Sequence, residues 1–475
     1  MTKHRVTRRL LAVALSVLLV LGCVAPAVAA TYESGTYTGT GTGRNGSVAL
    51  TLTLTNGAIA SVDNVTHSET ARYWEKAKVL LDRLVGLQTP EQVEKLDAVT
   101  GATLSSNAIK EAAKDVFRQA ESKETPVFAS GSGTKSDPYL IRTAAQLQAF
   151  AAAVNGGTGY EGQYISLDAD LDLTGTAWTP IGATGSFNGS FNGNYHTITG
   201  MTIGSESEKA SYTEAGLFGS VGKGAAIRNV GVINAAIYNK TTTDPSVGLL
   251  AAGISENSIV ESCWATGTIY SDTTSPYYSY VGGLVGSIGI KSLICNSWTN
   301  VVVYAKGSSD SFVGGIVGEN KENAIVIQYC ENRGKVSSAE RNAGGILGGT
   351  QQSSGSRILD CVNRGLVELP ANGKSSQNSV GGIAGGSLSI GSGVRIDNCS
   401  VTGAAISLTA ENWAYTGGIL GAQAMNGVIT NSWTDVTVSA ISKSGLTCVG
   451  GITAINSNGA MLANCAALGL SLIHI

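Results

Sequence analysis

The stretch VGGIAGGSLSIGSGVRIDNC, residues 380–399, decides the fold of most of the chain, because both of its halves recur. Variants of its first six residues also stand at 281–286, 313–318, 343–348, 416–421 and 449–454. Each is followed by a second signature like the one ending at Cys399, and equivalent positions of that signature lie 31 to 38 residues apart. These positions are Val230, Cys263, Ser297, Cys330, Cys361, Cys399, Ser432 and Cys465.

The repeats are built from Gly, Val, Ile, Thr and Ser, with few helix formers, which excludes helical repeats of similar period. One coil per repeat predicts an all-β, right-handed parallel β-solenoid over 176–475, preceded by an N-terminal cap at 138–175. Small inward positions tolerate Val, Ser or Cys, so we expect buried free thiols, with disulfides between neighbouring coils as the alternative. The preceding Asn or Asp predicts a ladder of turns; these residues are Asn229, Asp360, Asn398, Asn431 and Asn464.

Residues 31–122 predict a separate, small α+β domain. Strand alternation covers 36–43, 48–55 and 58–65, and helical periodicity covers 71–87 and about 105–120. Residues 123–137 are rich in Ser, Gly, Thr and Lys and predict a linker. The sequence thus predicts a multidomain chain, an α+β domain followed by a solenoid.

The segment DAVTGATLSS, residues 97–106, lies between the two predicted helices. It resembles the flavinylation motif Asp-x-x-Ser/Thr-Gly-Ala-Thr/Ser of the FMN-binding domain family, which includes flavin subunits of the sodium-pumping NADH:quinone oxidoreductase and of the Rnf complex. GTY at 35–37 and HSET at 67–70 match two further elements. The resemblance covers nearly all of 31–122 and implies FMN linked through its phosphate to Thr103 by a flavin transferase that uses FAD.

The residue types suit this chemistry. A phosphoester needs the hydroxyl of Thr103, and small Gly101 and Ala102 let a phosphate approach the backbone. A helix beginning near Ser105 would aim free N–H groups at the phosphate, and we expect Ser105 and Ser106 to donate further hydrogen bonds to it. The predicted cofactor-binding residues are Thr103, Asp97, Thr100, Gly101, Ala102, Ser105, Ser106, His67, Glu69 and Thr70.

Simpler interpretations stand beside these. Residues 100–103 alone are also typical of a turn followed by a helix N-cap, and His67 of a polar residue at a strand end. No Ser-His-Asp or paired-carboxylate arrangement and no Cys-x-x-Cys can be argued, so no catalytic residue and no metal ligand is predicted. With 14% charged residues, net charge −3 and no basic cluster after residue 9, we expect no nucleic-acid partner.

Residues 1–30 are typical of a signal peptide, with a basic start and an apolar run from Leu10 to Leu21. One route of processing is cleavage after Ala29. Alternatively, residues 20–23 resemble a lipobox, whose processing would leave Cys23 lipidated. Either route predicts an extracytoplasmic protein, secreted or associated with the membrane and cell envelope. The last repeat is broken mid-coil without a polar cap, which predicts a truncated reading frame.

Residues 132–470 resemble the GLUG-motif β-helical regions of bacterial surface proteins, and WTPIG at 178–182 resembles part of the entry coil of that group. Two function classes follow. In the first, the protein is an electron carrier and not a self-sufficient oxidoreductase. It exchanges electrons with membrane or extracellular redox partners, and the solenoid is a spacer or docking region. In the second, the solenoid is an adhesin or binds a surface glycan or protein, with outward-facing Trp264 and Trp298 stacking on a sugar.

Overall fold

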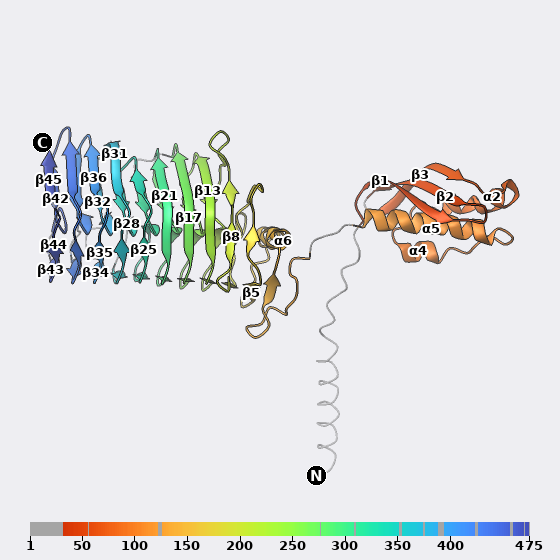
Figure 1. Cartoon of the computed structure of the whole chain (residues 1–475), viewed down its shortest axis with the longest axis horizontal. Coiled ribbons are helices and arrows are strands. Elements are labelled where there is room, and N and C mark those ends of the chain that lie inside the picture. Colours follow the sequence, from red (N-terminus) through yellow and green to blue (C-terminus); the bar gives the residue numbers. More distant parts are fainter. Residues whose placement is uncertain are drawn as a thin grey trace, which may run out of the picture. The chain divides into compact units, whose positions relative to one another are not determined.

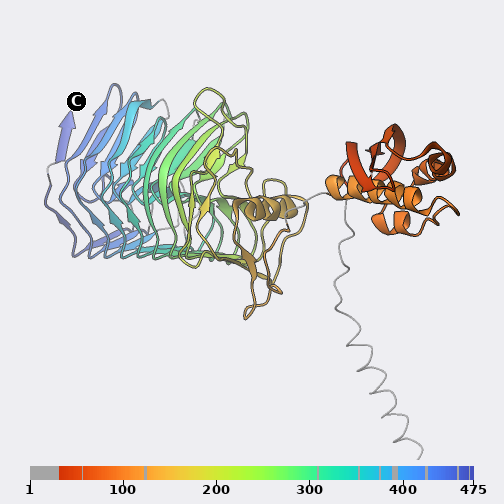
Figure 2. The ribbon, with the colours of Figure 1, turned by 45° about the vertical axis from the view of Figure 1, so that its right-hand side comes forward.

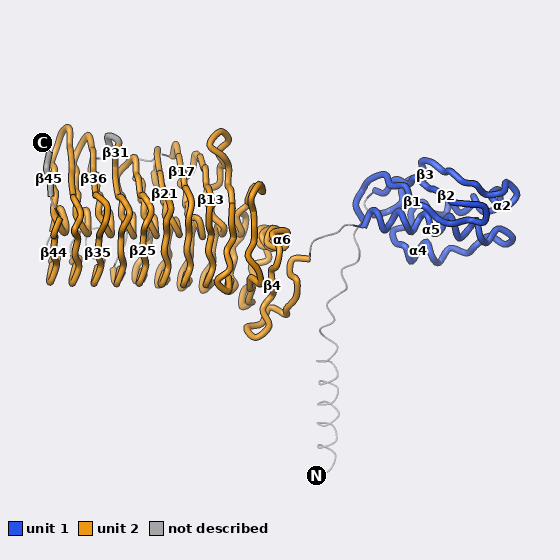
Figure 3. Tube along the Cα trace, viewed as in Figure 1, with its two compact units in different colours: residues 1–124 blue, residues 125–475 orange. Residues whose placement is uncertain are grey.

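The computed structural model describes residues 32–55, 57–121, 126–275, 277–307, 310–350, 354–373, 376–387, 394–422, 426–456, 459–469 and 471–474. The chain divides into two compact units, residues 1–124 and 125–475 (Figure 3). The predicted signal peptide, including Cys23, lies outside the described residues.

In its described residues, unit 1 contains a three-stranded antiparallel sheet and four helices, which confirms the small α+β fold. Its strands, in sheet order, are β1 (Gly35–Thr42), β2 (Ser47–Thr55) and β3 (Ala58–His67). Its helices are α2 (Ala71–Ala77), α3 (Val79–Leu84), α4 (Pro90–Glu94) and α5 (Thr103–Ala120). Helix α5 lies along the sheet (Figure 1), and its apolar side packs against alternate residues of β2 to form the core.

The alternation of Thr and Gly in β1 has a packing reason. A Cβ on Gly39 or Gly41 would lie 2.1 Å from a backbone oxygen of α5, so no side chain fits and the strand meets the helix backbone directly. The same helix also provides hydrogen-bond acceptors for the free edge of β1. The backbone N–H groups of Thr40 and Thr42 donate to the carboxylates of Asp115 and Glu111 in α5. Strand β1 and α5 therefore form one rigid pair.

The helices differ in detail from the sequence prediction. The single helix expected over 71–87 is divided into α2 and α3 at Lys78. Helix α4 was not expected; its N-cap is Thr89, whose hydroxyl accepts a hydrogen bond from Gln92 N, and Pro90 occupies its first position. Helix α5 begins at Thr103, two residues before the expected Ser105.

Unit 2 is an all-parallel β-solenoid of about eight turns, as predicted. Each complete coil passes in turn through four sheets, here numbered 1 to 4, and Figures 1 and 2 show the coils stacked in order of sequence. Sheet 1 contains β10 (Glu214–Ala215), β14 (Ser246–Gly248), β18 (Tyr278–Gly282), β22 (Asp310–Gly314), β27 (Asn342–Gly344), β32 (Gln377–Gly381), β37 (Trp413–Gly417) and β42 (Thr447–Gly450). Sheet 2 contains β11 (Phe218–Val221), β15 (Ala251–Ile254), β19 (Val285–Ile288), β23 (Val317–Asn320), β28 (Leu347–Thr350), β33 (Ala384–Ser387) and β38 (Leu420–Ala422).

The other two sheets extend further along the stack. Sheet 3 contains β4 (Tyr139–Ile141), β5 (Tyr164–Leu167), β7 (Ser190–Asn192), β12 (Ala226–Arg228), β16 (Ile259–Glu261), β20 (Leu293–Cys295), β24 (Val326–Gln328), β29 (Arg357–Leu359), β34 (Arg395–Asp397), β39 (Val428–Thr430) and β43 (Met461–Ala463). Sheet 4 contains β6 (Leu171–Asp172), β8 (Thr197–Thr199), β9 (Thr202–Ile203), β13 (Gly231–Thr241), β17 (Trp264–Thr273), β21 (Trp298–Lys306), β25 (Glu331–Asn332), β26 (Val336–Ser338), β30 (Val362–Asn363), β31 (Val367–Gly373), β35 (Ser400–Val401), β36 (Ile406–Ala410), β40 (Trp433–Thr434), β41 (Val438–Ser442), β44 (Ala466–Ala467) and β45 (Ser471–His474).

The two repeated signatures are the corners of the coil. The Gly-Gly pair of the first joins sheets 1 and 2, where a Cβ on Gly282 would lie 1.9 Å from Val285 O. The second signature joins sheets 3 and 4 through a residue in the left-handed region, such as Asp360 at φ 53° and Asn398 at φ 52°. These angles confirm the predicted ladder of turns.

The equivalent positions after these turns form the predicted internal ladder. Seven of them, from Val230 to Ser432, are buried, and Cys465 in the last coil is partly exposed. The cysteines among the described residues are free thiols, as expected. Burial raises the pKa of Cys263 to about 12, so this thiol stays protonated near neutral pH.

The N-terminal cap of the solenoid contains helix α6 (Ala144–Asn155), whose N-cap Thr143 accepts a hydrogen bond from Gln146 N. Phe150 of this helix packs against Phe187, 5.7 Å between ring centroids, and so covers the first coils. Residues 126–137, expected to be linker, instead fold onto this cap: Ala129 N donates to Leu140 O, and Phe128 stacks on Tyr139 at 4.3 Å. The Ser- and Gly-rich composition of this segment predicted a linker and did not reveal the packing of Phe128 against the cap.

Candidate functional site

The segment 97–106 is folded around a tight turn and the buried Ser106. Ala102 N donates to Val99 O at 2.9 Å, and Gly101 has φ 78°, which favours glycine at this position of the turn. The Ser106 hydroxyl accepts from Val99 N at 3.1 Å and donates to Ala102 O at 2.9 Å. These hydrogen bonds therefore fix the conformation of the turn that precedes α5.

Thr103 is the first residue of α5 and is exposed. No hydrogen bond joins its hydroxyl to another residue in the part of the chain that the structure describes. No side chain caps this 18-residue helix, so its first N–H groups are left for an outside acceptor. An anion at this end would also be stabilised by the helix dipole, by about 0.3–1 kcal/mol when exposed.

Residues from two other elements complete the site. A cavity of about 160 Å³ is lined by Arg44 and Tyr73 together with residues 101–105, and the Arg44 guanidinium lies 5.3 Å from the centre of the Tyr73 ring. The amine of Lys76 lies 3.3 Å from where a Cβ on Gly101 would be. Two cations thus flank the start of α5. Sequence reasoning missed Arg44, Tyr73 and Lys76 because they belong to no motif.

Glu69 supports the site from beneath. Its buried carboxylate accepts hydrogen bonds from the Ser105 hydroxyl and from Asn45 N, the latter at 2.9 Å. Burial acts to raise the pKa of Glu69. The two hydrogen bonds above, a third from the Arg44 backbone and the charge of the nearby His67 together have the larger effect, so the pKa is lowered from 4.5. An ionised Glu69 therefore ties the β1–β2 turn to α5.

His67 and Thr70 lie on either side of Glu69 and are exposed. The His67 ring stacks on Trp74 at 3.9 Å, and its Nδ1 accepts a hydrogen bond from Glu69 N at 3.2 Å. Thr70 accepts from the Asn45 amide at 2.6 Å. These residues are held by the local structure and do not line the cavity at Thr103.

The remaining predicted residues separate into two groups. Asp97 and Thr100 are exposed and do not line the cavity. Ser105 and Ser106 are 1% and 0% exposed, and their hydroxyls donate to Glu69 and to Ala102 O. The expectation that both hydroxyls donate to a phosphate on Thr103 is therefore not met, because each proton already has an acceptor inside the fold. The sequence did not reveal this structural role of Ser105 and Ser106, because it predicted a helix start near Ser105 and α5 begins at Thr103.

Residues 43–118 match the family model of the FMN-binding domain. Unit 1 thus carries an FMN-binding domain. The match supports FMN binding and covers β2, β3, α2, α3, α4 and most of α5.

Two known proteins share part of this sequence. A putative Gly-rich membrane protein of Evansella cellulosilytica is 38% identical over 119 residues, 24% of this chain and 13% of that protein. Halomucin of Haloquadratum walsbyi is 27% identical over 206 residues, 40% of this chain and 2% of that protein. The chain thus spans only a small part of the length of either relative.

Among solved structures, a putative immunoglobulin A1 protease from Bacteroides ovatus aligns with a TM-score of 0.45 and 20% identity. The alignment covers 72% of this chain and 87% of that one. Among the helices described here, none has the length and apolar character needed to cross a membrane.

The two tryptophans proposed for sugar stacking, Trp264 and Trp298, pair in register on neighbouring coils. Both are only partly exposed. The Trp264 ring lies against Gly231, where a Cβ would be 2.3 Å from it, and Arg333 lies over the Trp298 ring at 4.7 Å. Each ring thus contacts the protein on one side and is less exposed than Trp413 or Trp433, which leaves less of it open to a sugar.

Proposed function

We propose that FMN is attached to Thr103 through a phosphoester. A flavin transferase would direct the Thr103 hydroxyl oxygen onto the FMN phosphorus of FAD. The new P–O bond forms as the bond to the AMP phosphate oxygen breaks; AMP leaves, and a base of the transferase takes the hydroxyl proton. The single observation that carries this proposal is the exposed, unpartnered hydroxyl of Thr103 at the start of α5.

The surroundings of Thr103 fit a phosphodiester. The free N–H groups of the first turn of α5 are suited to an anion, and Arg44 and Lys76 add positive charge beside it. The family's dependence on Ser or Thr is met, and Gly101 leaves the backbone open on the side of Lys76. These features support binding of FMN by its phosphate end.

Bound FMN supplies reversible electron exchange, and we propose that the protein acts as an electron carrier. The cavity at Thr103, about 160 Å³, is below the roughly 300–1,000 Å³ of a typical small-molecule site, so much of the flavin would stay accessible to a partner. His67 is already stacked on Trp74 and bonded to Glu69 N, which leaves it poorly placed as a proton donor to a substrate. Membrane or extracellular redox proteins are the proposed partners.

The proposed location is outside the cytoplasm. The basic and apolar pattern of residues 1–30 supports export, with Cys23 as a candidate lipid anchor. The Evansella relative is described as a membrane protein, which agrees with an envelope location. A covalent link suits such a place because a released FMN could not be recovered from the cytoplasm. The solenoid would then serve as a spacer or docking region.

Coexpression with a flavin transferase tests the attachment. After denaturing electrophoresis, flavin fluorescence should persist in the wild type and in Thr103→Ser and vanish in Thr103→Ala, and the intact mass should rise by FMN less one water. Thr55→Ala, an exposed threonine outside both the motif and the cavity, is the matched control and should stay flavinylated. Fluorescence retained by Thr103→Ala would overturn the assignment.

The carrier role needs a separate measurement. The reduced, flavinylated protein should pass electrons to quinones, soluble dyes or other flavoproteins. Given a dye donor alone, it should show no turnover of fumarate-like acids. Steady turnover of such an acid, abolished by Thr103→Ala, would make the protein an enzyme and end the carrier proposal.

A further inference from the structure

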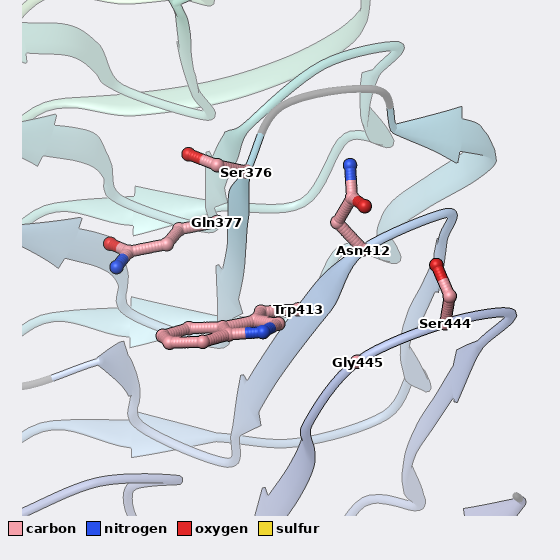
Figure 4. Close-up of a pocket in the computed structure, with 6 residues that line it drawn as sticks. All are labelled: Ser376, Gln377, Asn412, Trp413, Ser444 and Gly445. Atoms are coloured by element: carbon pink, nitrogen blue, oxygen red, sulfur yellow. The ribbon is translucent and has the colours of Figure 1, made fainter.

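The outer side of sheet 1 carries a pocket near its C-terminal end, far along the sequence from the flavin site. Its volume is about 530 Å³, and it is lined by Ser376, Gln377, Asn412, Trp413, Ser444 and Gly445. Gln377 and Trp413 are register partners on the neighbouring strands β32 and β37. Figure 4 shows their side chains projecting in the same direction, with Asn412 and Ser444 on the loop side of the indole.

Trp413 is held as an open platform. Its side chain is 44% exposed, although it is one of the largest apolar groups of the chain. Its inner edge packs against Gly445, which has φ 112° and where a Cβ would lie 2.5 Å from the indole. Tyr415, 6.3 Å away at an interplanar angle of 83°, supports it from the side. The ring is thus fixed in position while a large part of it remains in solvent.

The polar groups around the indole are neutral. The hydroxyl of Ser376 and the amide of Gln377 have no hydrogen-bond partner among the described residues, and the Asn412 amide lines the same pocket. Ser444 donates to Glu411 O at 2.7 Å, which leaves its oxygen as an acceptor. The nearby charges, Lys443 and Glu411, pair with each other at 3.7 Å. The pocket therefore offers donors and acceptors without net charge.

This combination selects the chemistry of the ligand. An aromatic face is electron-rich and favours weakly positive C–H groups above it. A pyranose ring presents such C–H groups on one face, while its hydroxyl groups project from the rim, where amides and hydroxyls can bind them. A charged ligand would find no counter-charge here, and an apolar one would leave the Gln377 amide desolvated without a partner among the described residues. We propose that this pocket binds a neutral saccharide, with one pyranose unit stacked on Trp413.

The proposal is independent of the flavin and of the Trp264 and Trp298 pair. Those two rings each contact the protein on one side. Trp413 differs because its ring is more exposed, and because the neighbouring Ser376 and Gln377 side chains have no hydrogen-bond partner among the described residues. The same solenoid also provides a matched control in Trp433, which is 40% exposed but lies on sheet 4, outside the pocket.

Saturation-transfer NMR on the full chain tests the proposal. The probes are neutral tetrasaccharides of β-linked glucose, galactose, xylose and N-acetylglucosamine, with a tetragalacturonate as the charged comparison. At least one neutral probe should receive saturation, strongest on the ring protons of one face. Titration of tryptophan fluorescence should give at least tenfold weaker binding for Trp413→Ala and measurable weakening for Gln377→Ala. Trp433→Ala should bind like the wild type.

Several results would overturn it. No transfer to any neutral probe at about 10 mM, transfer only to the galacturonate, or binding that survives Trp413→Ala would each remove the proposed site. Circular dichroism of every variant should match the wild type, and Trp413→Phe, which keeps an aromatic face, should retain part of the affinity. Loss of binding in Trp433→Ala with retention in Trp413→Ala would assign the sugar to sheet 4 instead.

Discussion

The hydroxyl of Ser105 donates a hydrogen bond to the carboxylate of Glu69, 36 residues earlier in the chain, and both side chains are buried. The contact joins the first turn of α5 to the segment between β3 and α2. It explains why a buried serine stands two residues after Thr103 without its hydroxyl being available to a group on Thr103.

Replacing Ser105 by Ala should destabilise unit 1 without preventing flavinylation. The loss of one donor to a buried carboxylate costs about 1–3 kcal/mol. Hydrogen–deuterium exchange of the α5 peptide should speed up accordingly, and flavin fluorescence per folded molecule should be unchanged. Ser68→Ala, an exposed neighbour, is the control and should change neither. Loss of flavin with unchanged exchange would instead assign Ser105 to the phosphate.

The stability of unit 1 should also depend on pH through Glu69. Because hydrogen bonding lowers its folded-state pKa below 4.5, the ionised carboxylate stabilises unit 1 above that pH, and the contribution is lost as the pH falls through the lowered pKa. Calorimetry should show unit 1 of the wild type unfolding at higher temperature than Glu69→Gln at pH 7. The two transitions should converge as the pH falls below 4.5, whereas a constant gap would contradict the assignment.

Comparing Gly101→Ala with Gly57→Ala should separate the effect of backbone strain on stability from any effect on flavinylation. Both glycines have nearly the same φ, 78° and 77°, and an alanine there costs about 1–2 kcal/mol. Only the Cβ at position 101 would meet the Lys76 amine, whereas nothing lies within 4 Å at position 57. We expect similar loss of stability in both variants and reduced flavinylation in Gly101→Ala alone. Equal flavinylation of the two would refute a positional role for Gly101.

The solenoid thiols should differ in reactivity by burial. Cys263 and Cys361 are fully buried, and burial raises the pKa of both thiols, whereas Cys448 is only partly covered. With a thiol reagent at pH 8, Cys448 and Cys465 should react first and the others only after denaturation. Cys448→Ser should remove part of the fast phase. Rapid labelling of Cys361 in the folded protein would contradict this order.

The repeats and the hydrophobic periods predicted both units correctly, because Gly-Gly corners and Asn turns leave a regular trace in the sequence. The break at Lys78 and the fold of residues 126–137 were not predictable in this way, since neither interrupts a pattern. At the proposed flavin site, the motif predicted Thr103 and Gly101. It could not identify Arg44 and Lys76, which other elements bring to α5 only in the folded chain. The GLUG-motif resemblance, the signal peptide and the covalent bond stay predictions.

The in-register stacking of coils has a consequence for how such a chain can change over generations. In the described part of the solenoid each strand pairs with strands of the adjacent coils, so duplicating or deleting one whole repeat would leave every remaining corner with an equivalent partner. Each added repeat would lengthen the stack by about 4.8 Å, the spacing between paired strands. A partial duplication would put side chains where corner glycines must stand and would be removed by selection. Length in this unit can therefore drift in fixed steps while its cross-section stays constant.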